Sequence, residues 1–178
     1  MKQFARIWRA YLLAQFADSF GPCALPQDLT GGLNPVYSSE KDTYNYILDE
    51  LADAVKAIDV SVEPTEDQAK CDPYFGYDAT KWVKYANSLM LRLAMRISYA
   101  DETTAQKYAR QALNHTFGVM TSKSDEAQMS TGAGMVFRNN IEWLANQYNE
   151  CRMGSSMFSY LLGYQDPRLS AYFEASPS

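Results

Sequence analysis

The sequence predicts an all-α fold, and three observations support this prediction. Apolar residues recur at spacings of three and four over long stretches, which is the periodicity of amphipathic helices. The strand pattern of alternating apolar and polar residues never continues beyond a few positions. Helix-ending residues, Gly21-Pro22 and Pro64, follow the first two periodic stretches. The 178 residues, 47% of them hydrophobic, suffice for one domain with a core.

The first periodic stretch predicts a helix over residues 3–18 that ends at Gly21-Pro22. Residues 21–38 are rich in Pro and Gly and too polar for a strand, so we expect a loop there. The apolar positions that define the helix are Phe4, Ile7, Trp8, Tyr11 and Leu12.

A second helix is predicted over residues 40–58, with Ser39 as its N-cap. Acidic residues and a lysine cover its other side, and Pro64 with the acidic segment around it ends the helical pattern. Its apolar stripe consists of Tyr44, Ile47, Leu48, Leu51, Val55 and Ile58.

A third helix is predicted over residues 79–99, with Asp78 as its N-cap. Apolar residues cover most of its circumference, which is typical of a central helix with several neighbours. We expect that this chain does not cover the helix completely, and that the chain therefore exposes a large apolar patch and associates.

A fourth helix is predicted over residues 104–114, where Thr103 and Gln106 fit a capping box. About four residues separate it from the third helix, so the two should run antiparallel. Small residues on one face, including Ala105 and Ala112, would let the pair approach closely. This unit resembles a tetratricopeptide hairpin. Short helices are also expected at 139–147 and 155–164.

Composition and motifs argue against several classes of function. A net charge of −5 without a basic run argues against nucleic acid as a partner. No apolar run approaches the roughly 18 residues of a membrane span. Three separated cysteines and one histidine make a zinc site improbable, and no cofactor motif is present.

Catalytic residues are not evident in the sequence. His115 is the only histidine, and it stands where the fourth helix should end. Asp72, Asp78 and Asp101 are candidates for the two carboxylates of a glycosidase, but no spacing selects two of them. We therefore predict that the chain is not an enzyme.

Several motifs occur in an order that resembles the SusD/RagB family. The stretch 81–96, KWVKYANSLMLRLAMR, looks like a helix shared by many of its members. Residues 9–11 and 18–21 are similar to the family's RAY and D.YG stretches, and 44–54 resembles the helix that follows. Residues 166–169, DPRL, look like a family turn.

The resemblance implies tetratricopeptide-like hairpins with long ligand-binding loops. It also implies an outer-membrane lipoprotein that is exposed at the cell surface and that partners a SusC-like TonB-dependent transporter. The implied function is non-catalytic binding of a glycan, or of a peptide, for delivery to that transporter. Residues 1–178 would form part of a single SusD-like helical domain that lacks the signal peptide and the C-terminal portion. The alternative is a tetratricopeptide-like scaffold that binds proteins.

Polar residues of the 81–96 motif favour a structural role. Asn87 and Ser88 lie in an apolar helix, so we expect them to bond to a neighbouring helix or to backbone. Arg92 and Arg96 are expected to pair with acids of the second helix or to bond the loops.

Aromatic residues beside amides and charges are the best candidates for a glycan site, because rings stack on sugars while polar groups bond the hydroxyls. Two short segments offer such residues, although Trp143 could instead pack inside a short helix. The predicted glycan-binding residues are Trp143, Tyr148, Arg152, Asn140, Tyr74 and Tyr77.

Overall fold

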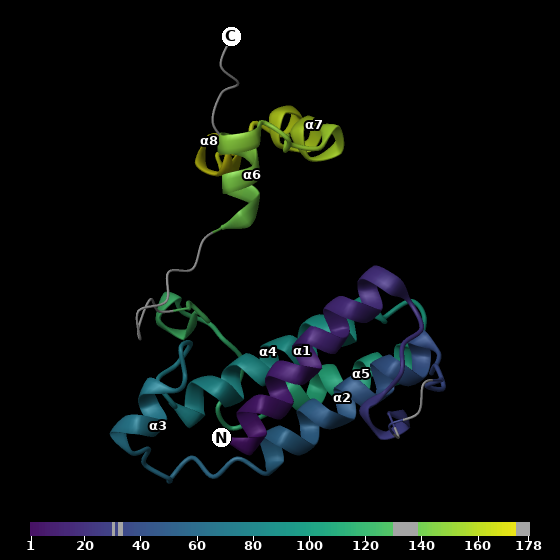
Figure 1. Ribbon diagram of the computed structural model, residues 1–178, viewed down its shortest axis with the longest axis vertical. Helices are drawn as coiled ribbons and strands as arrows, with labels where there is room; N and C mark the ends of the chain where they lie inside the picture. The colour runs from purple at the N-terminus through teal and green to yellow at the C-terminus, as the bar shows by residue number, and fades with distance from the viewer. Residues whose placement is uncertain (30, 32–33, 130–138, 174–178) are drawn as a thin grey trace. The chain divides into compact units, whose positions relative to one another are not determined.

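The computed structural model describes residues 1–29, 31, 34–129 and 139–173 (Figure 1). The chain divides into two compact units, Met1–Ala133 and Gly134–Ser178. The predicted all-α class is confirmed. Within the described residues, the only extended pairing is an isolated bridge between Cys23 and Ser38.

The first unit is built from two antiparallel hairpins. Helix α1 (Lys2–Phe20) pairs with α2 (Glu40–Lys56), and α4 (Ala79–Arg96) pairs with α5 (Glu102–Leu113). In the first hairpin, Arg6 near the start of α1 bonds Glu50 near the end of α2 at 2.8 Å. The predicted hairpin arrangement is confirmed.

The two hairpins stack with α1 parallel to α4 and α2 parallel to α5, as the side-by-side helices of Figure 1 show. At the helix starts, the rings of Phe4 and Trp82 stack with centroids 5.1 Å apart. At the helix ends, Arg96 pairs with Asp18 at 3.0 Å. The hydroxyl of Tyr108 on α5 donates to Asp49 on α2.

The buried face of α1 differs from the predicted stripe, of which only Phe4 and Ile7 are buried. Three alanines with Phe4 and Ile7 form this face, and their small size lets α2 approach closely. Leu12 lies off the face and is 50% exposed. The four-residue spacing between Trp8 and Leu12 correctly predicted a helix. The face of α1 that contacts α2 is nevertheless the one that carries the alanines. The buried α1 residues are Phe4, Ile7, Ala10, Ala14 and Ala17.

Helix α4 is the central helix, as predicted, but it is well covered. Its buried apolar side chains pack between α2 and α5, and Met95 is the one large apolar side chain of α4 that is mostly exposed. The expected gap in its coverage was therefore wrong. The buried α4 residues are Ala79, Trp82, Val83, Ala86, Asn87, Leu89, Met90, Leu93 and Ala94.

Two predicted caps are confirmed and one is wrong. The side chain of Ser39 accepts the backbone N–H of Asp42, and that of Asp78 accepts the N–H of Lys81. At α5, Asp101 rather than Thr103 is the N-cap, since its carboxylate accepts the Thr104 N–H at 3.0 Å. A carboxylate at this position also interacts favourably with the positive end of the helix dipole. The helix begins two residues before its predicted start.

Short helical turns occupy the connections and were not predicted. They are η1 (Pro26–Asp28), α3 (Glu66–Lys70) and η2 (Lys123–Asp125). Each has at most five residues, which is too short for apolar periodicity to identify it. The boundary of α3 is nevertheless well formed, because a capping box joins Thr65 and Gln68.

The second unit contains α6 (Asn140–Tyr148), α7 (Ser155–Gly163) and α8 (Arg168–Tyr172). The short helices predicted at 139–147 and 155–164 are confirmed, whereas α8 was not predicted. None of these three helices fully buries a side chain. The mostly exposed apolar residues of α6 and α7 are Ile141, Tyr148, Met157, Phe158, Tyr160 and Leu162.

Candidate functional site

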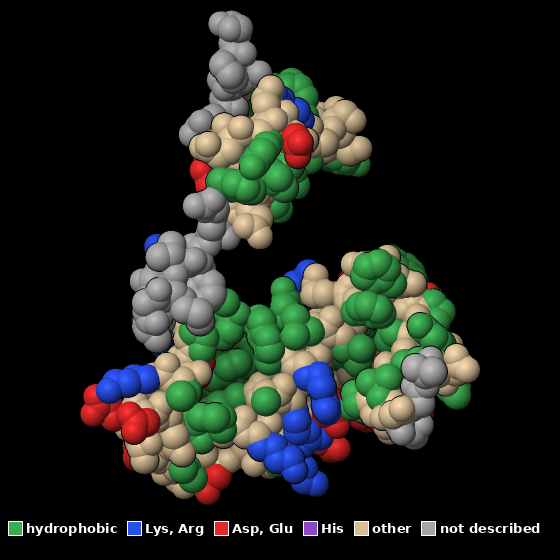
Figure 2. Space-filling model, viewed as in Figure 1, with side chains coloured by type: hydrophobic (Ala, Val, Ile, Leu, Met, Phe, Trp, Pro, Cys, Tyr) green, Lys and Arg blue, Asp and Glu red, His purple; other side chains and the backbone are tan. Residues whose placement is uncertain are grey.

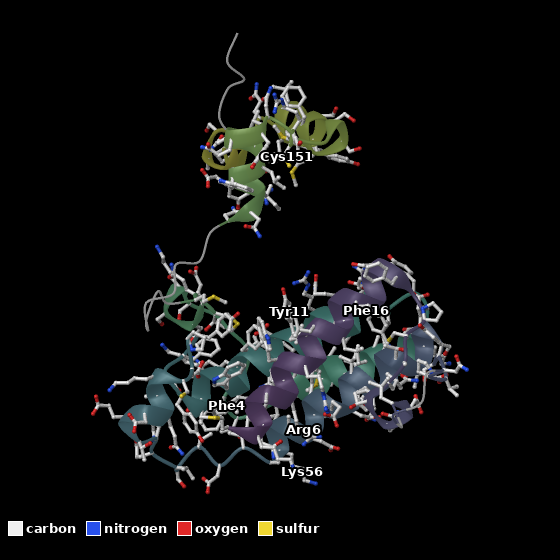
Figure 3. The ribbon with its side chains drawn as sticks, viewed as in Figure 1. Phe4, Arg6, Tyr11, Phe16, Lys56 and Cys151 are labelled. Carbon is white, nitrogen blue, oxygen red and sulfur yellow. The ribbon has the colours of Figure 1, made fainter. Side chains whose placement is uncertain are left out.

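An aromatic cluster joins the start of α1, the start of α4 and the loop before α4. Hydrophobic side chains gather over α1 and α4 on the visible face of the first unit (Figure 2). Tyr11 lies at this place, whereas Arg6 lies on the side of α1 that faces α2 (Figure 3). The cluster consists of Phe4, Trp8, Tyr11, Tyr74, Phe75, Tyr77, Trp82 and Tyr85.

A single carboxylate, that of Asp72, shapes the loop that carries part of this cluster. It accepts backbone N–H groups of Tyr74 at 3.1 Å and Tyr77 at 2.8 Å. It also accepts the indole N–H of Trp82 at 2.6 Å. Gly76 and Tyr77 have positive φ, at 58° and 71°, and the bond to Tyr77 holds that strained turn. Asp72 thereby ties the loop to α4.

The cluster has a buried layer and an open layer. Phe4, Phe75 and Trp82 are buried and form its base. The open layer, which we call the platform, consists of the half-buried side chains of Trp8, Tyr11, Tyr74 and Tyr85. The Trp8 ring lies 5.0 Å from that of Tyr11 and 4.8 Å from that of Tyr74.

The tyrosine side chains of the platform influence one another electrostatically. Burial raises the pKa of Tyr85 to about 12, and the neighbouring Tyr11 and Tyr74 add to the rise. Burial likewise raises the pKa of Tyr74, again with a contribution from Tyr11. Within the described part of the chain, none of these three hydroxyls donates a hydrogen bond to a protein group.

The predicted residues of this region separate into two roles. Tyr74 belongs to the platform, whereas Tyr77 packs edge-on against Phe4 with centroids 4.9 Å apart. Trp8 and Tyr11 were missed because their helical spacing assigned them to the apolar stripe of the first helix, and Tyr85 was considered only as part of the 81–96 motif. The available signal was the excess of rings with a polar end among those stripe positions.

A second aromatic pair lies on α6, in the second unit. The rings of Trp143 and Tyr148 meet edge to face with centroids 4.8 Å apart. Arg152 bonds the side chain of Asn149 and, at 2.8 Å, the carbonyl of Cys151. Asn140 begins the helix, about 12 Å along its axis from Tyr148. The structure thus brings Trp143 and Tyr148 together and leaves Asn140 apart.

The carboxylates considered for catalysis have structural partners. Asp72 binds the aromatic loop, while Asp78 and Asp101 cap α4 and α5. His115 accepts the N–H of Phe117 at 3.3 Å, in the turn after α5. Among the residues described, no three His, Cys, Asp or Glu side chains form a group that could hold a metal.

The polar residues of α4 fix the segment that follows α5. Asn87 donates to the carbonyl of Gly118 at 2.8 Å, and Ser88 accepts the N–H of Met120 at 2.8 Å. The expected bonding to backbone is confirmed. Lys84 pairs with the buried Asp125 at 2.8 Å. The structural role expected for these motif residues therefore holds.

The two arginines of the motif behave differently. Arg96 pairs with Asp18 of α1, so the expected pairing with an acid of α2 was wrong. The reason is that the ends of the parallel helices α1 and α4 lie together. Arg92 is exposed and forms no ion pair or hydrogen bond with a described residue. Burial raises the pKa of the nearby Tyr85, and the positive charge of Arg92 opposes part of that rise.

Comparison with known proteins identifies the family. The SusD-like family model, described as Susd and RagB outer membrane lipoprotein, matches residues 1–178. The chain belongs to the SusD-like family. No described helix is long and apolar enough to cross a membrane. No match was found among curated proteins.

Solved SusD-like structures share the fold. A chitin-binding SusD homologue from Flavobacterium johnsoniae is 29% identical with a TM-score of 0.84, over 97% of this chain and 36% of that chain. A SusD-like protein from Bacteroides thetaiotaomicron is 30% identical with a TM-score of 0.81, over 94% and 34%. A SusD homologue from Bacteroides uniformis is 26% identical with a TM-score of 0.81, over 98% and 36%. The chain spans about a third of the length of these structures.

Proposed function

We propose that this SusD-like chain binds a glycan without cleaving it. The platform of Trp8, Tyr11, Tyr74 and Tyr85 is the observation that carries the proposal. It offers ring faces for stacking beside hydroxyls that can bond a sugar, and the solved relative from Flavobacterium johnsoniae is described as chitin-binding. The structural use of Asp72, Asp78 and Asp101 supports binding without catalysis.

The pair on α6 is a second place where a sugar could stack. Trp143 and Tyr148 present two rings at one end of α6, with Arg152 following that end. Because the two units are compact by themselves, each group can be tested in the same chain by separate substitutions. We propose the platform as the principal site and the α6 pair as a further contact.

Titration calorimetry with chitin oligosaccharides tests the proposal. We expect saturable binding that a Tyr74→Ala substitution weakens. Tyr37→Ala is the matched control, since Tyr37 is exposed in a loop outside both aromatic groups. An absence of binding to chitin and to a panel of other oligosaccharides would contradict the proposal. Equal loss in both variants would reject the platform as the site.

The transport context is proposed from the family. Its members are described as outer membrane lipoproteins, so we propose a surface location at the outer membrane and delivery of the glycan to a SusC-like TonB-dependent transporter. We also propose that the chain forms part of a larger SusD-like domain, because it matches about a third of the solved relatives. Copurification of the transporter with the chain in its native cell tests the partnership.

A protein-binding scaffold is the second candidate function. One observation favours it: Leu12, Phe16 and Phe20 form an exposed apolar stripe at four-residue spacing on α1. Such a stripe fits a protein surface better than a sugar. Substitution of this stripe should abolish partner binding under the scaffold hypothesis, while leaving binding of chitin oligosaccharides intact.

A further inference from the structure

The arginine beside the platform is placed to recognise a negative group. Arg92 lies seven residues after Tyr85 on α4, which puts both on the same face of the helix, two turns apart. Most other described arginines have an acidic or amide partner. Arg6 and Arg9 bind Glu50, Arg96 binds Asp18, and Arg168 binds Asp166. Among the described residues, Arg92 and Arg110 have no such partner, and of these two only Arg92 lies on the helix that carries Tyr85.

We propose that the platform binds an anionic glycan, and that Arg92 contacts the carboxylate or sulfate of one sugar unit. This inference rests on the proposed function and names its class of ligand. The rings of Trp8 and Tyr74 would stack on the sugar, and the tyrosine hydroxyls would bond its hydroxyl groups. The guanidinium then supplies a charge-assisted bond in a fixed direction from the stacked ring.

The charges around the platform agree with a single anionic contact. Asp72 is the carboxylate nearest to the aromatic rings, and its oxygens are taken by the loop N–H groups and by Trp82. Asp72 is half-buried and bonds the indole of Trp82, which belongs to the buried base of the cluster. Arg92 is an exposed positive charge on the Tyr85 face of α4, whereas the N-terminal ammonium of Met1 is bonded to the Tyr77 hydroxyl.

Three oligosaccharides of similar length distinguish the possible ligands in titration calorimetry with the whole chain. Oligogalacturonate carries carboxylates only, a sulfated galactan oligosaccharide carries sulfates only, and a chitin oligosaccharide is neutral. We expect one anionic ligand to bind about tenfold more tightly than the neutral one, as one charge-assisted bond would provide. This preference should decline as salt is raised.

Arg92→Gln should remove the preference and leave neutral binding unchanged, while Arg92→Lys should restore part of it. Arg110→Gln on α5 is the matched control, because Arg110 is also exposed and outside the cluster. Equal affinities for all three ligands, or an unchanged preference in Arg92→Gln, would overturn the inference and leave glycan binding standing. An absence of binding to all three would overturn both the inference and the proposed function.

Discussion

Lys84 of α4 and Asp125 of the segment after α5 form a 2.8 Å ion pair whose carboxylate is buried. The second oxygen of Asp125 accepts the N–H groups of Thr121 and Ser122. The bond from Lys84, and then those from Thr121 and Ser122, hold the pKa of Asp125 well below its usual range. These bonds hold residues 121–125, which show no helical periodicity in the sequence, in a fixed position against α4.

This ion pair predicts a pH-dependent loosening of residues 121–125. Because the folded state lowers the pKa of Asp125, its contribution to stability is complete above the unfolded value of 3.8 and is lost as pH falls below it. We expect amide exchange at Thr121 and Ser122 to lose protection in this acid range before the helices unfold. Asp125→Asn should remove the pH dependence. Unchanged protection down to global unfolding would contradict the prediction.

Asn87→Ala should destabilise the first unit by about 1–3 kcal/mol, the usual effect of leaving a buried polar group unpaired. The Asn87 side chain is 1% exposed, and its loss leaves the Gly118 carbonyl without this donor. Urea unfolding measures the change. Asn45→Ala on α2 is the control, since Asn45 is partly exposed. An equal effect of both substitutions would show that the bond from Asn87 to Gly118 makes no particular contribution to the free energy of unfolding.

Asp72→Ala should release the aromatic loop and cost about 1–3 kcal/mol, because the indole of Trp82 and several loop amides lose their acceptor. Tryptophan fluorescence should shift as the environment of Trp82 changes. Asp67→Ala on the exposed face of α3 provides the control. A fluorescence spectrum and melting temperature like those of the unsubstituted chain would contradict the role of Asp72.

Phe20→Ser should reduce self-association of the chain. Phe20 is 72% exposed and continues a stripe with Leu12 and Phe16, and such patches promote association in water. Sedimentation velocity over a range of concentrations measures the effect. Tyr99→Ser is the control, since Tyr99 is fully exposed and lies outside the stripe. A chain that is monomeric at all concentrations would contradict the prediction.

Trp143→Ala should weaken glycan binding while leaving the melting temperature nearly unchanged. Trp143 is half-buried and α6 fully buries none of its side chains, so loss of this ring should cost less stability than loss of a core tryptophan. A core tryptophan would instead cost roughly 3–5 kcal/mol. Both quantities are measured on the same variant. A large fall in melting temperature would assign Trp143 to packing and leave the platform as the remaining candidate.

Helical periodicity predicted the principal helices well because it depends on burial over many residues. Residues such as Ile47 and Leu51 repeat over four or more turns and lie at 0% exposure. The end of α1 was marked by Gly21, which has the positive φ that favours glycine. Short elements such as α3 have too few residues for this signal, and their formation depends on local caps.

The candidate site was less predictable, because it is assembled from residues far apart in the chain. Tyr74 was identified from its own loop, but its neighbour Trp8 comes from α1, which only the stacking of α1 on α4 brings close. The exposure of Leu12 shows the same limit. Periodicity indicates which residues share a face, but the alanines decided which face α2 contacts.

Asp18 has a consequence for the mechanics of the first unit. Its carboxylate is shared by the Tyr44 hydroxyl of α2 and the guanidinium of Arg96 on α4, so it joins both hairpins at one point. The bond to Tyr44 lies within the first hairpin and holds the carboxylate in place, so sliding one hairpin along the other would break the pair between Asp18 and Arg96. Asp18 therefore fixes the position of the end of α4 relative to the first hairpin, and its removal should loosen the contact between the two hairpins at this end while the stacked rings of Phe4 and Trp82 hold the other end.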